Sequence, residues 1–306
     1  MLKDIQVKLS DFNVKSSNEL NNYINTQKGY ILPNIALINA SLLWSKGYTG
    51  NGIKIAVIDT GYAPHDDLKN NIIGGRNFTT EDKGDTNIYT DYNGHGSHCC
   101  GIIAGNGHIK GVAPNAKLLV LKVLEGNGNG NLQSVVDAVN YAVSQKVDII
   151  SMSLGCKQNI TELHTAIKNA VDNNIVVVSA IGNDGDGKSE TNEIDYPSYY
   201  QEVISVGAID NAKVNATFSN SNTNCDLVAP GVNIISTGLN NGFIEMSGTS
   251  MACPHVTGAV ALLIEKFKKE WNRTPLESES YAQLIKNTVD LGIPRTVQGN
   301  GLLFLK

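Results

Sequence analysis

Several common sequence features are scarce or absent in this chain of 306 residues, and each absence narrows what the chain can be. Proline is scarce, with 8 residues, whereas glycine is abundant, with 30 residues. This balance is typical of many tight turns between strands and not of a disordered chain. Lysine and arginine do not exceed the acidic residues, and the net charge is −5. A nucleic-acid partner would need a basic face, so we expect none.

The chain also lacks the apolar segments that direct proteins to membranes. The first thirty residues contain no apolar core of a secretory signal, and no stretch approaches the length of a membrane span. The five cysteines form no Cys-x-x-Cys pair, which disfavours a zinc site or a disulfide framework and favours a reducing compartment. We therefore expect a cytoplasmic protein without membrane contacts. Secretion by another route stays open, and the sequence indicates no oligomeric state.

Short apolar runs alternate with helical patterns beyond residue 33. Runs rich in isoleucine and valine predict buried strands at 53–58, 118–123, 149–152 and 175–178, with shorter strands at 203–206, 226–228 and 234–235. Apolar periodicity predicts helices at 95–104, 132–144, 161–172, 250–268 and 277–288. The alternation predicts a three-layer α/β fold, with a mostly parallel central sheet and helices on both faces.

Three segments carry residue types that suit nucleophilic acyl transfer. Asp59 ends the strand predicted at 53–58, and His95, between two glycines, begins the helix predicted at 95–104. Ser250 lies in Gly-Thr-Ser-Met-Ala-Cys-Pro-His, at the start of an apolar helix. In such chemistry a serine attacks, a histidine takes and returns the proton, and an aspartate holds the histidine tautomer. Ligands of open α/β folds bind at the carboxyl edge of the sheet, where these segments could converge.

A fourth segment can stabilise the oxyanion that such an attack creates. Ser250 begins a helix, where unpaired N–H groups and the helix dipole favour negative charge. Asn183 follows the strand predicted at 175–178, in Ala-Ile-Gly-Asn-Asp. Its side-chain amide could donate to the oxyanion together with the backbone N–H of Ser250.

In this order and spacing, the four segments resemble the signatures of the subtilisin-like serine proteases, the subtilase family. The resemblance runs from about Pro33 to the C-terminus, and the segments 73–79, 146–155 and 281–286 are most similar to the intracellular subtilisins. It implies a subtilisin-like fold and an endopeptidase that works through an acyl-enzyme. The residues implied in the chemistry are a triad of Asp59, His95 and Ser250, with Asn183 as the oxyanion donor.

The resemblance also implies how the enzyme holds a polypeptide substrate. One edge strand would pair with the substrate backbone by strand addition, and a glycine loop would form the opposite edge. A further pocket would take the fourth residue before the cut. These substrate-binding residues are, in that order, Ser153, Leu154 and Gly155, then Gly128, then Leu132 and Val135.

One position departs from the family pattern in a way that bears on specificity. The pair Tyr196-Pro197 matches a Tyr-Pro pair that follows the floor of the primary specificity pocket. Glycine is common at that floor position, but this chain has Asp195. An acid in a mostly apolar slot should attract lysine or arginine, which predicts a preference for a basic residue just before the cut. Alternatively, Asp195 points to solvent among neighbouring acids.

A second departure concerns calcium. Asp67 matches a carboxylate that helps to bind calcium in many subtilases. The partner loop around 106–109 is a few residues shorter than usual, whereas calcium needs six to eight oxygen ligands. A structural calcium ion at Asp67 is therefore an open expectation, and no cofactor is expected to take part in the chemistry.

The same resemblance divides the chain into two regions and leaves its biological role open. Residues 1–32 are polar and rich in asparagine, and we expect an N-terminal extension or short pro-segment there, ahead of a peptidase domain at 33–306. Intracellular relatives often use such an extension to cover the cleft, although their usual Leu-Ile-Pro-Tyr block is not clearly present. The expected role is general intracellular proteolysis. The alternatives are a dedicated protease that removes leader peptides from modified bacterial peptides, and an inactive peptide-binding module.

Overall fold

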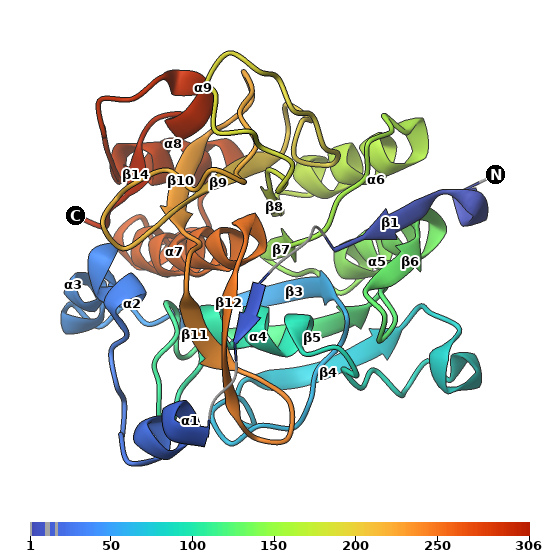
Figure 1. The fold of residues 1–306 in the computed structure, drawn as a ribbon, viewed down its shortest axis with the longest axis horizontal. Helices are drawn as coiled ribbons and strands as arrows, with labels where there is room; N and C mark the ends of the chain where they lie inside the picture. The colour runs from blue at the N-terminus through green and yellow to red at the C-terminus, as the bar shows by residue number, and fades with distance from the viewer. Residues whose placement is uncertain (1, 10–12, 16–17) are drawn as a thin grey trace.

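The computed structural model describes residues 2–9, 13–15 and 18–306, with only the backbone at 13–15. Met1, 10–12 and 16–17, all within the predicted N-terminal extension, lie outside the described residues. Figure 1 shows helices on both sides of a large central sheet.

The central sheet of the described chain has nine strands in the order β13-β14-β10-β9-β8-β7-β3-β5-β4. The neighbours from β14 to β4 pair in parallel, and β13 joins the edge in the antiparallel sense. The strands are β3 (Lys54–Asp59), β4 (Ile72–Asn77), β5 (Lys117–Lys122), β7 (Ile149–Met152), β8 (Val176–Ala180), β9 (Ile204–Ile209), β10 (Leu227–Pro230), β13 (Thr288–Val289) and β14 (Leu302–Leu303).

Two hydrophobic cores cover the two faces of this sheet, and strand periodicity divides the residues between them. Along β3, Ile55 and Val57 belong to one core, whereas Ala56 and Ile58 belong to the other. Successive side chains of a strand point to opposite faces, so a strand between two helical layers must be apolar throughout. This explains the unbroken apolar runs of the sequence and confirms the predicted three-layer α/β fold.

The helices divide between the same two faces. The long helix α7 packs on β7, β8, β9 and α4 in the first core, and α5 packs against α6 in the second. The α-helices are α1 (Asn18–Asn25), α2 (Pro33–Leu37), α3 (Ala40–Ser45), α4 (His95–Ala104), α5 (Leu132–Ser144), α6 (Thr161–Asp172), α7 (Thr249–Glu270), α8 (Glu277–Lys286) and α9 (Arg295–Gln298), with short 3-10 turns at Leu2–Asp4 and Glu81–Gly84.

Two small sheets lie beside the central one, and the N-terminal segment contributes a strand to each. β1 (Gln6–Lys8) pairs with β6 (Asn129–Asn131), and β2 (Asn13–Lys15) pairs with β12 (Phe243–Ser247), which also pairs with β11 (Ile234–Thr237). Figure 1 shows β1 near β6 and β2 near β12.

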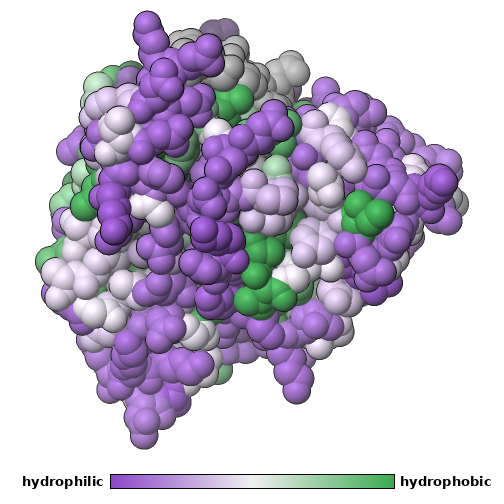
Figure 2. All heavy atoms as spheres, turned by 90° about the horizontal axis from the view of Figure 1, so that it is seen from below, coloured by the Kyte–Doolittle hydropathy of each residue, from purple (hydrophilic) through white to green (hydrophobic). Residues whose placement is uncertain are grey.

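The described surface is predominantly polar. Large exposed hydrophobic side chains are few and scattered along the chain, among them Tyr23, Ile73 and Val214. On the face seen in Figure 2, hydrophobic residues gather only in small separate patches. Within the described part of the chain, every helix is too short or too polar to cross a bilayer.

Candidate active site

Asp59 and His95 meet at the carboxyl edge of the sheet. Asp59 is the last residue of β3 and His95 the first residue of α4, and both side chains are fully buried. His95 Nδ1 lies 2.8 Å from Asp59 Oδ1, which also accepts the backbone N–H of Thr60 at 2.7 Å. A carboxylate only accepts hydrogen bonds, so Nδ1 carries the proton. That tautomer leaves the lone pair of the imidazole on Nε2, as a general base requires.

Asp91 holds the start of α4, and the sequence analysis did not single it out. Its Oδ1 accepts the backbone N–H of Gly94 at 2.8 Å and the hydroxyl of Thr60 at 2.9 Å, while Oδ2 accepts Ser97 N–H at 2.9 Å. The buried carboxylate therefore ties the residue after Asp59 to the turn that carries His95. Gly94 and not Asp91 is the N-cap of α4, so a search for capping residues would not have found Asp91.

Ser250 completes the group from the second residue of α7. Cys99, one turn beyond His95, places its Sγ 3.9 Å from His95 Nδ1 and 3.6 Å from the Ser250 carbonyl oxygen. This shared contact brings the two helix starts together. Ser250 is almost completely buried, and its hydroxyl donates to the carbonyl of Ser153 at 3.2 Å. Burial raises the pKa of the Cys99 thiol well above its usual value, so Cys99 is a packing group and not a competing nucleophile.

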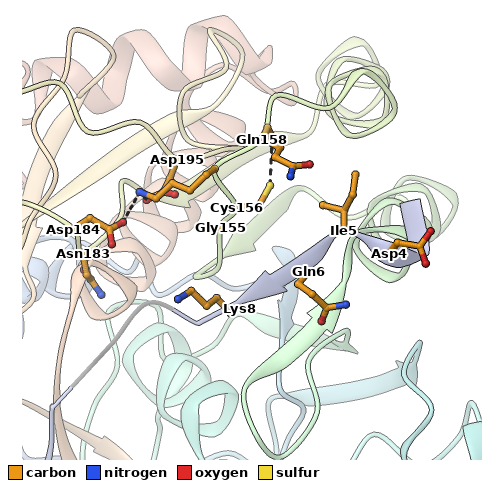
Figure 3. Close-up of a pocket in the computed structure, with 11 residues that line it drawn as sticks. Asp4, Ile5, Gln6, Lys8, Gly155, Cys156, Gln158, Asn183, Asp184 and Asp195 are labelled. Atoms are coloured by element: carbon orange, nitrogen blue, oxygen red, sulfur yellow. Dashed lines mark hydrogen bonds and ion pairs between the residues drawn. The ribbon is translucent and has the colours of Figure 1, made fainter. Parts of the chain in front are cut away.

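Asn183 lies beside the start of the same helix. Its Oδ1 accepts both the backbone N–H and the hydroxyl of Thr249, each at 2.8 Å. These two bonds fix the amide with its nitrogen directed away from Thr249. Asn183 lines the cavity drawn in Figure 3, where the nitrogen end of its side chain points away from Asp184. An amide held in this way is a preorganised donor next to Ser250.

The two buried histidines near the site, His98 and His255, are structural. His98 contacts the carbonyl of Ile234 at 2.9 Å, and His255 contacts the carbonyl of Met251 at 2.8 Å. Complete burial lowers the pKa of His98 to about 3 and that of His255 to about 4. Both therefore stay neutral near pH 7, and they add no charge beside His95.

The two edges predicted to hold substrate backbone already hold a strand, and that strand is the chain's own N-terminal segment. Leu9 N–H donates to the carbonyl of Gly128 at 3.1 Å, and β1 pairs antiparallel with the adjoining β6. On the other side, Lys8 forms an antiparallel bridge with Gly155, with both N···O distances at 3.5 Å. Gly128 has a φ of +80°, a conformation that favours glycine at this edge.

The apolar side chains of this segment are buried. Val7 is 1% exposed and belongs to the hydrophobic cluster that contains Leu132, Val135 and Leu154. Leu132 and Val135 are the residues expected to line the pocket for the fourth residue before the cut. The segment therefore combines backbone pairing with burial of alternate side chains, which is how strand addition binds a peptide.

Beside Gly155 lies a cavity of about 410 Å³ that includes Asp195. Asp195 is 6% exposed, and Figure 3 shows it with Asp184 and Asn183 at the end of the cavity opposite Asp4. Burial raises the pKa of the Asp195 carboxyl to about 6, against the opposing effect of Lys157. Lys157, which the sequence analysis did not name, contacts Asp195 at 3.2 Å. No residue pattern in the sequence marks this pair.

The surroundings of Asp67 do not suit a calcium ion. Its carboxylate accepts N–H bonds from His108 and Ile109 at 2.9 and 2.8 Å, and His108 Nδ1 lies 2.9 Å from it. These partners are donors, whereas calcium needs further oxygen acceptors. Within the described residues, the one cluster able to hold a metal by its His, Cys and acidic groups is Asp59, His95 and Cys99. The shortened loop thus closes on Asp67 through its own N–H groups, and we assign no ion there.

A buried Asp-His pair, a serine at a helix start and a fixed amide donor define the site of a serine hydrolase. Comparison with known proteins is consistent with this class. The profile of the subtilase family, a peptidase family, matches residues 50–303. The chain belongs to that family and is a subtilisin-like serine protease, whose catalysis needs no cofactor.

Individual relatives cover most of the chain. It is 51% identical over 276 residues to the major intracellular serine protease of Bacillus subtilis, covering 89% of this chain and 86% of the relative. It is 50% identical to an intracellular serine protease of Paenibacillus polymyxa, covering 89% and 84%. Subtilisin DY of Bacillus licheniformis is 40% identical, with 76% and 84% covered.

Proposed function

We propose that this chain is an intracellular endopeptidase in which Ser250 is the nucleophile, His95 the general base and acid, Asp59 its partner and Asn183 the oxyanion donor. The observation that carries the proposal is that residues far apart in sequence converge: His95 contacts Asp59, and Cys99 contacts both His95 and the backbone carbonyl of Ser250.

In this proposal each step of the reaction belongs to one group. Ser250 Oγ leaves the Ser153 carbonyl, attacks the substrate carbonyl carbon, and passes its proton to His95 Nε2. The resulting imidazolium is stabilised by the Asp59 carboxylate 2.8 Å from Nδ1. The carbonyl oxygen, now negative, is held by Asn183 Nδ2 and by the N–H groups at the start of α7. His95 then protonates the leaving amine, and water hydrolyses the acyl-enzyme by the same path.

The substrate lies as a strand between the loop at Gly128 and the edge formed by Ser153, Leu154 and Gly155. Leu132 and Val135 take an apolar side chain at the fourth residue before the cut. Asp195, buried in the adjacent cavity, favours lysine or arginine immediately before the cut. Its burial supports this assignment over a side chain that points to solvent.

The segment 1–32 acts as a short inhibitory extension on the peptidase domain at 33–306. Its described residues 6–9 use the same edges and the same apolar pocket as a substrate would, so both cannot bind together. Displacement or removal of this strand is the activating event.

The biological role proposed is general proteolysis inside the cell, in the cytoplasm. It rests on the relatives, two of which are named intracellular serine proteases. The alternative, a dedicated leader peptidase, draws its support from the basic preference proposed for Asp195.

A serine-directed sulfonyl fluoride, followed by peptide mapping, tests the proposed chemistry. We expect labelling at Ser250, loss of casein hydrolysis in proportion to labelling, and no labelling of Ser250→Ala. The matched control is Ser144→Ala, which removes an exposed hydroxyl at the end of α5 and keeps the nucleophile. Labelling elsewhere, or full activity after Ser250 is labelled, would contradict the assignment.

A further inference from the structure

Three charged side chains gather at one end of the primary pocket. Lys157 Nζ lies 3.2 Å from Asp195 Oδ2 and also contacts Asp184 Oδ2. All three residues line the cavity beside Gly155. Two carboxylates and one ammonium leave one negative charge in this group once both acids are ionised.

The two carboxylates differ in how firmly they are held. The side chain of Asp195 is 9% exposed and that of Asp184 is 56% exposed. Asn220 Nδ2 donates to Asp195 Oδ2 at 3.0 Å, and the oxygen of the same amide accepts Asp184 N–H at 2.7 Å. Gly182, at φ +116°, packs so closely that a Cβ there would lie 2.2 Å from Asp195 Oδ2. Asp195 is therefore fixed in place.

Lys157 is the member of the group that contacts both carboxylates. Its side chain is 57% exposed, and it bridges a buried and an exposed carboxylate. Partial burial opposes its charge, but the contacts with Asp184 and Asp195 together raise the pKa of Lys157, so it stays an ammonium ion. An exposed lysine pairs weakly with any one carboxylate because water competes for both ions. Lys157 can therefore give up one of its two carboxylate partners at little cost in free energy.

The N-terminal strand brings a second cation to the same place. Lys8 lines the cavity, and Figure 3 shows its amine directed from β1 toward the end where Asn183 and Asp184 lie. Its charge lowers the pKa of the Asp184 carboxyl, alongside the larger effect of Lys157 and against desolvation. The two carboxylates of the pocket can therefore balance one cation in addition to Lys157.

We propose that Lys157 is a specificity-determining residue of the primary pocket, one that exchanges partners with the substrate. When the residue before the cut is apolar, Lys157 stays on Asp195 and neutralises it. When that residue is lysine or arginine, the substrate cation takes Asp195 and Lys157 is retained by Asp184 alone. This inference rests on the proposed place of Asp195 at the floor of the pocket. It makes the enzyme tolerant of both basic and apolar residues, with the balance set by Lys157.

The test compares two peptides that differ only in arginine or phenylalanine before the cut, using the kcat/KM ratio at pH 7.5. Lys157→Met should raise the arginine-to-phenylalanine ratio by roughly tenfold. With the arginine peptide, the cation that competes for Asp195 is gone. With the phenylalanine peptide, no ammonium ion neutralises Asp195. Asp184→Asn should lower the ratio by about threefold, since the displaced Lys157 has no second carboxylate. Lys188→Met, which removes an exposed lysine paired with Asp186, is the matched control and should leave the ratio unchanged.

Asp195→Asn separates this inference from the assignment beneath it. It should lower the ratio by at least about tenfold, and adding Lys157→Met to it should have no further effect on the ratio. If Asp195→Asn lowers the ratio but Lys157→Met and Lys157→Gln leave it unchanged, the exchange is wrong and the pocket assignment survives. If Asp195→Asn leaves the ratio unchanged, the proposed basic preference is wrong and the inference falls with it.

Discussion

The proposed catalytic centre and the proposed primary pocket are built in different ways. Asp59, His95 and Ser250 sit at the end of a strand and the starts of two helices, and all three are buried. In the pocket, Asp195 is buried, whereas its partners Lys157 and Asp184 are more than half exposed. The chemistry is thus fixed by secondary structure, and the charge balance of the pocket is not.

This difference explains why chemistry and selectivity can vary separately. A group held by the sheet and two helices has one geometry, which preorganised catalysis requires. Exposed charges exchange partners at little cost, so a pocket made from them can accept more than one kind of side chain. We therefore expect substitutions in the catalytic centre to change turnover, and substitutions in the primary pocket to change selectivity.

The largest effect should come from the catalytic centre. Ser250→Ala should reduce turnover on the order of 10⁶-fold with both arginine and phenylalanine substrates, which is the size of the loss known for the nucleophile of subtilisin itself. The arginine-to-phenylalanine ratio of the residual turnover should not depend on the triad. Peptide-hydrolysis kinetics measure both quantities. Turnover within tenfold of the unchanged protein would contradict the role of Ser250.

Asn183→Ala should have the next largest effect. Removal of an oxyanion donor costs about 10²–10³ in kcat, as is known for subtilisin, and the effect should fall on kcat with little change in KM. Because Oδ1 of Asn183 also accepts two bonds from Thr249, a thermal unfolding curve must accompany the kinetics. Thr249→Val removes one of those bonds and serves as the control. An equal loss in kcat for both variants would argue for a purely structural Asn183.

The N-terminal strand offers a test of whether the cleft is covered. Val7→Asp should raise activity on small peptides on the order of tenfold, because a buried valine contributes about 1.5–3 kcal/mol to holding the strand in place. Val7 is 1% exposed, whereas Lys3 on the same segment is exposed, so Lys3→Gln is the matched control. Initial rates on freshly prepared protein measure the effect. Unchanged rates in Val7→Asp would indicate that the strand does not inhibit.

The smallest effect expected is a change of selectivity with pH. The pKa of Asp195, raised by burial to about 6, means that the carboxyl is neutral well below pH 6 and charged well above it. The arginine-to-phenylalanine ratio of kcat/KM should therefore rise severalfold from pH 5 to pH 7.5. Asp184 and Lys157 face Asp195, but both keep their charge across this range, since their pKa values are lowered and raised respectively.

Taking the ratio removes every effect of pH that acts equally on both substrates. Asp195→Asn should abolish the pH dependence of the ratio. A ratio that is flat in the unchanged protein would show that Asp195 does not meet the substrate.

The sequence predicted the scaffold well because the central strands and helices have strong patterns. The helices at 95–104, 132–144 and 161–172 match α4, α5 and α6 to the residue, and the strand at 149–152 matches β7. Strand β4 was missed because Ile-Ile-Gly-Gly-Arg-Asn has two glycines, which weaken any strand pattern. Short helices such as α2 carry too little periodicity to be recognised.

The site was predictable only where local sequence determines it. Asp59, His95 and Ser250 stand at element ends that can be recognised from flanking residues. The contact of Lys157 with Asp195 joins residues 38 positions apart, and that of Leu9 with Gly128 spans more than a hundred. Such contacts depend on how loops and the N-terminal segment pack in three dimensions. No local sequence pattern predicts that packing.

We conclude that a fixed catalytic centre works beside an adjustable pocket. The most direct test measures pre-steady-state acylation of the Asp195→Asn variant with matched arginine and phenylalanine esters. We expect an unchanged burst of one acyl group per chain with both esters, an acylation rate at least about tenfold slower with arginine, and a rate within about twofold of the unchanged protein with phenylalanine. A parallel loss of rate with both esters would contradict it, because catalysis and selectivity would then share one structural unit.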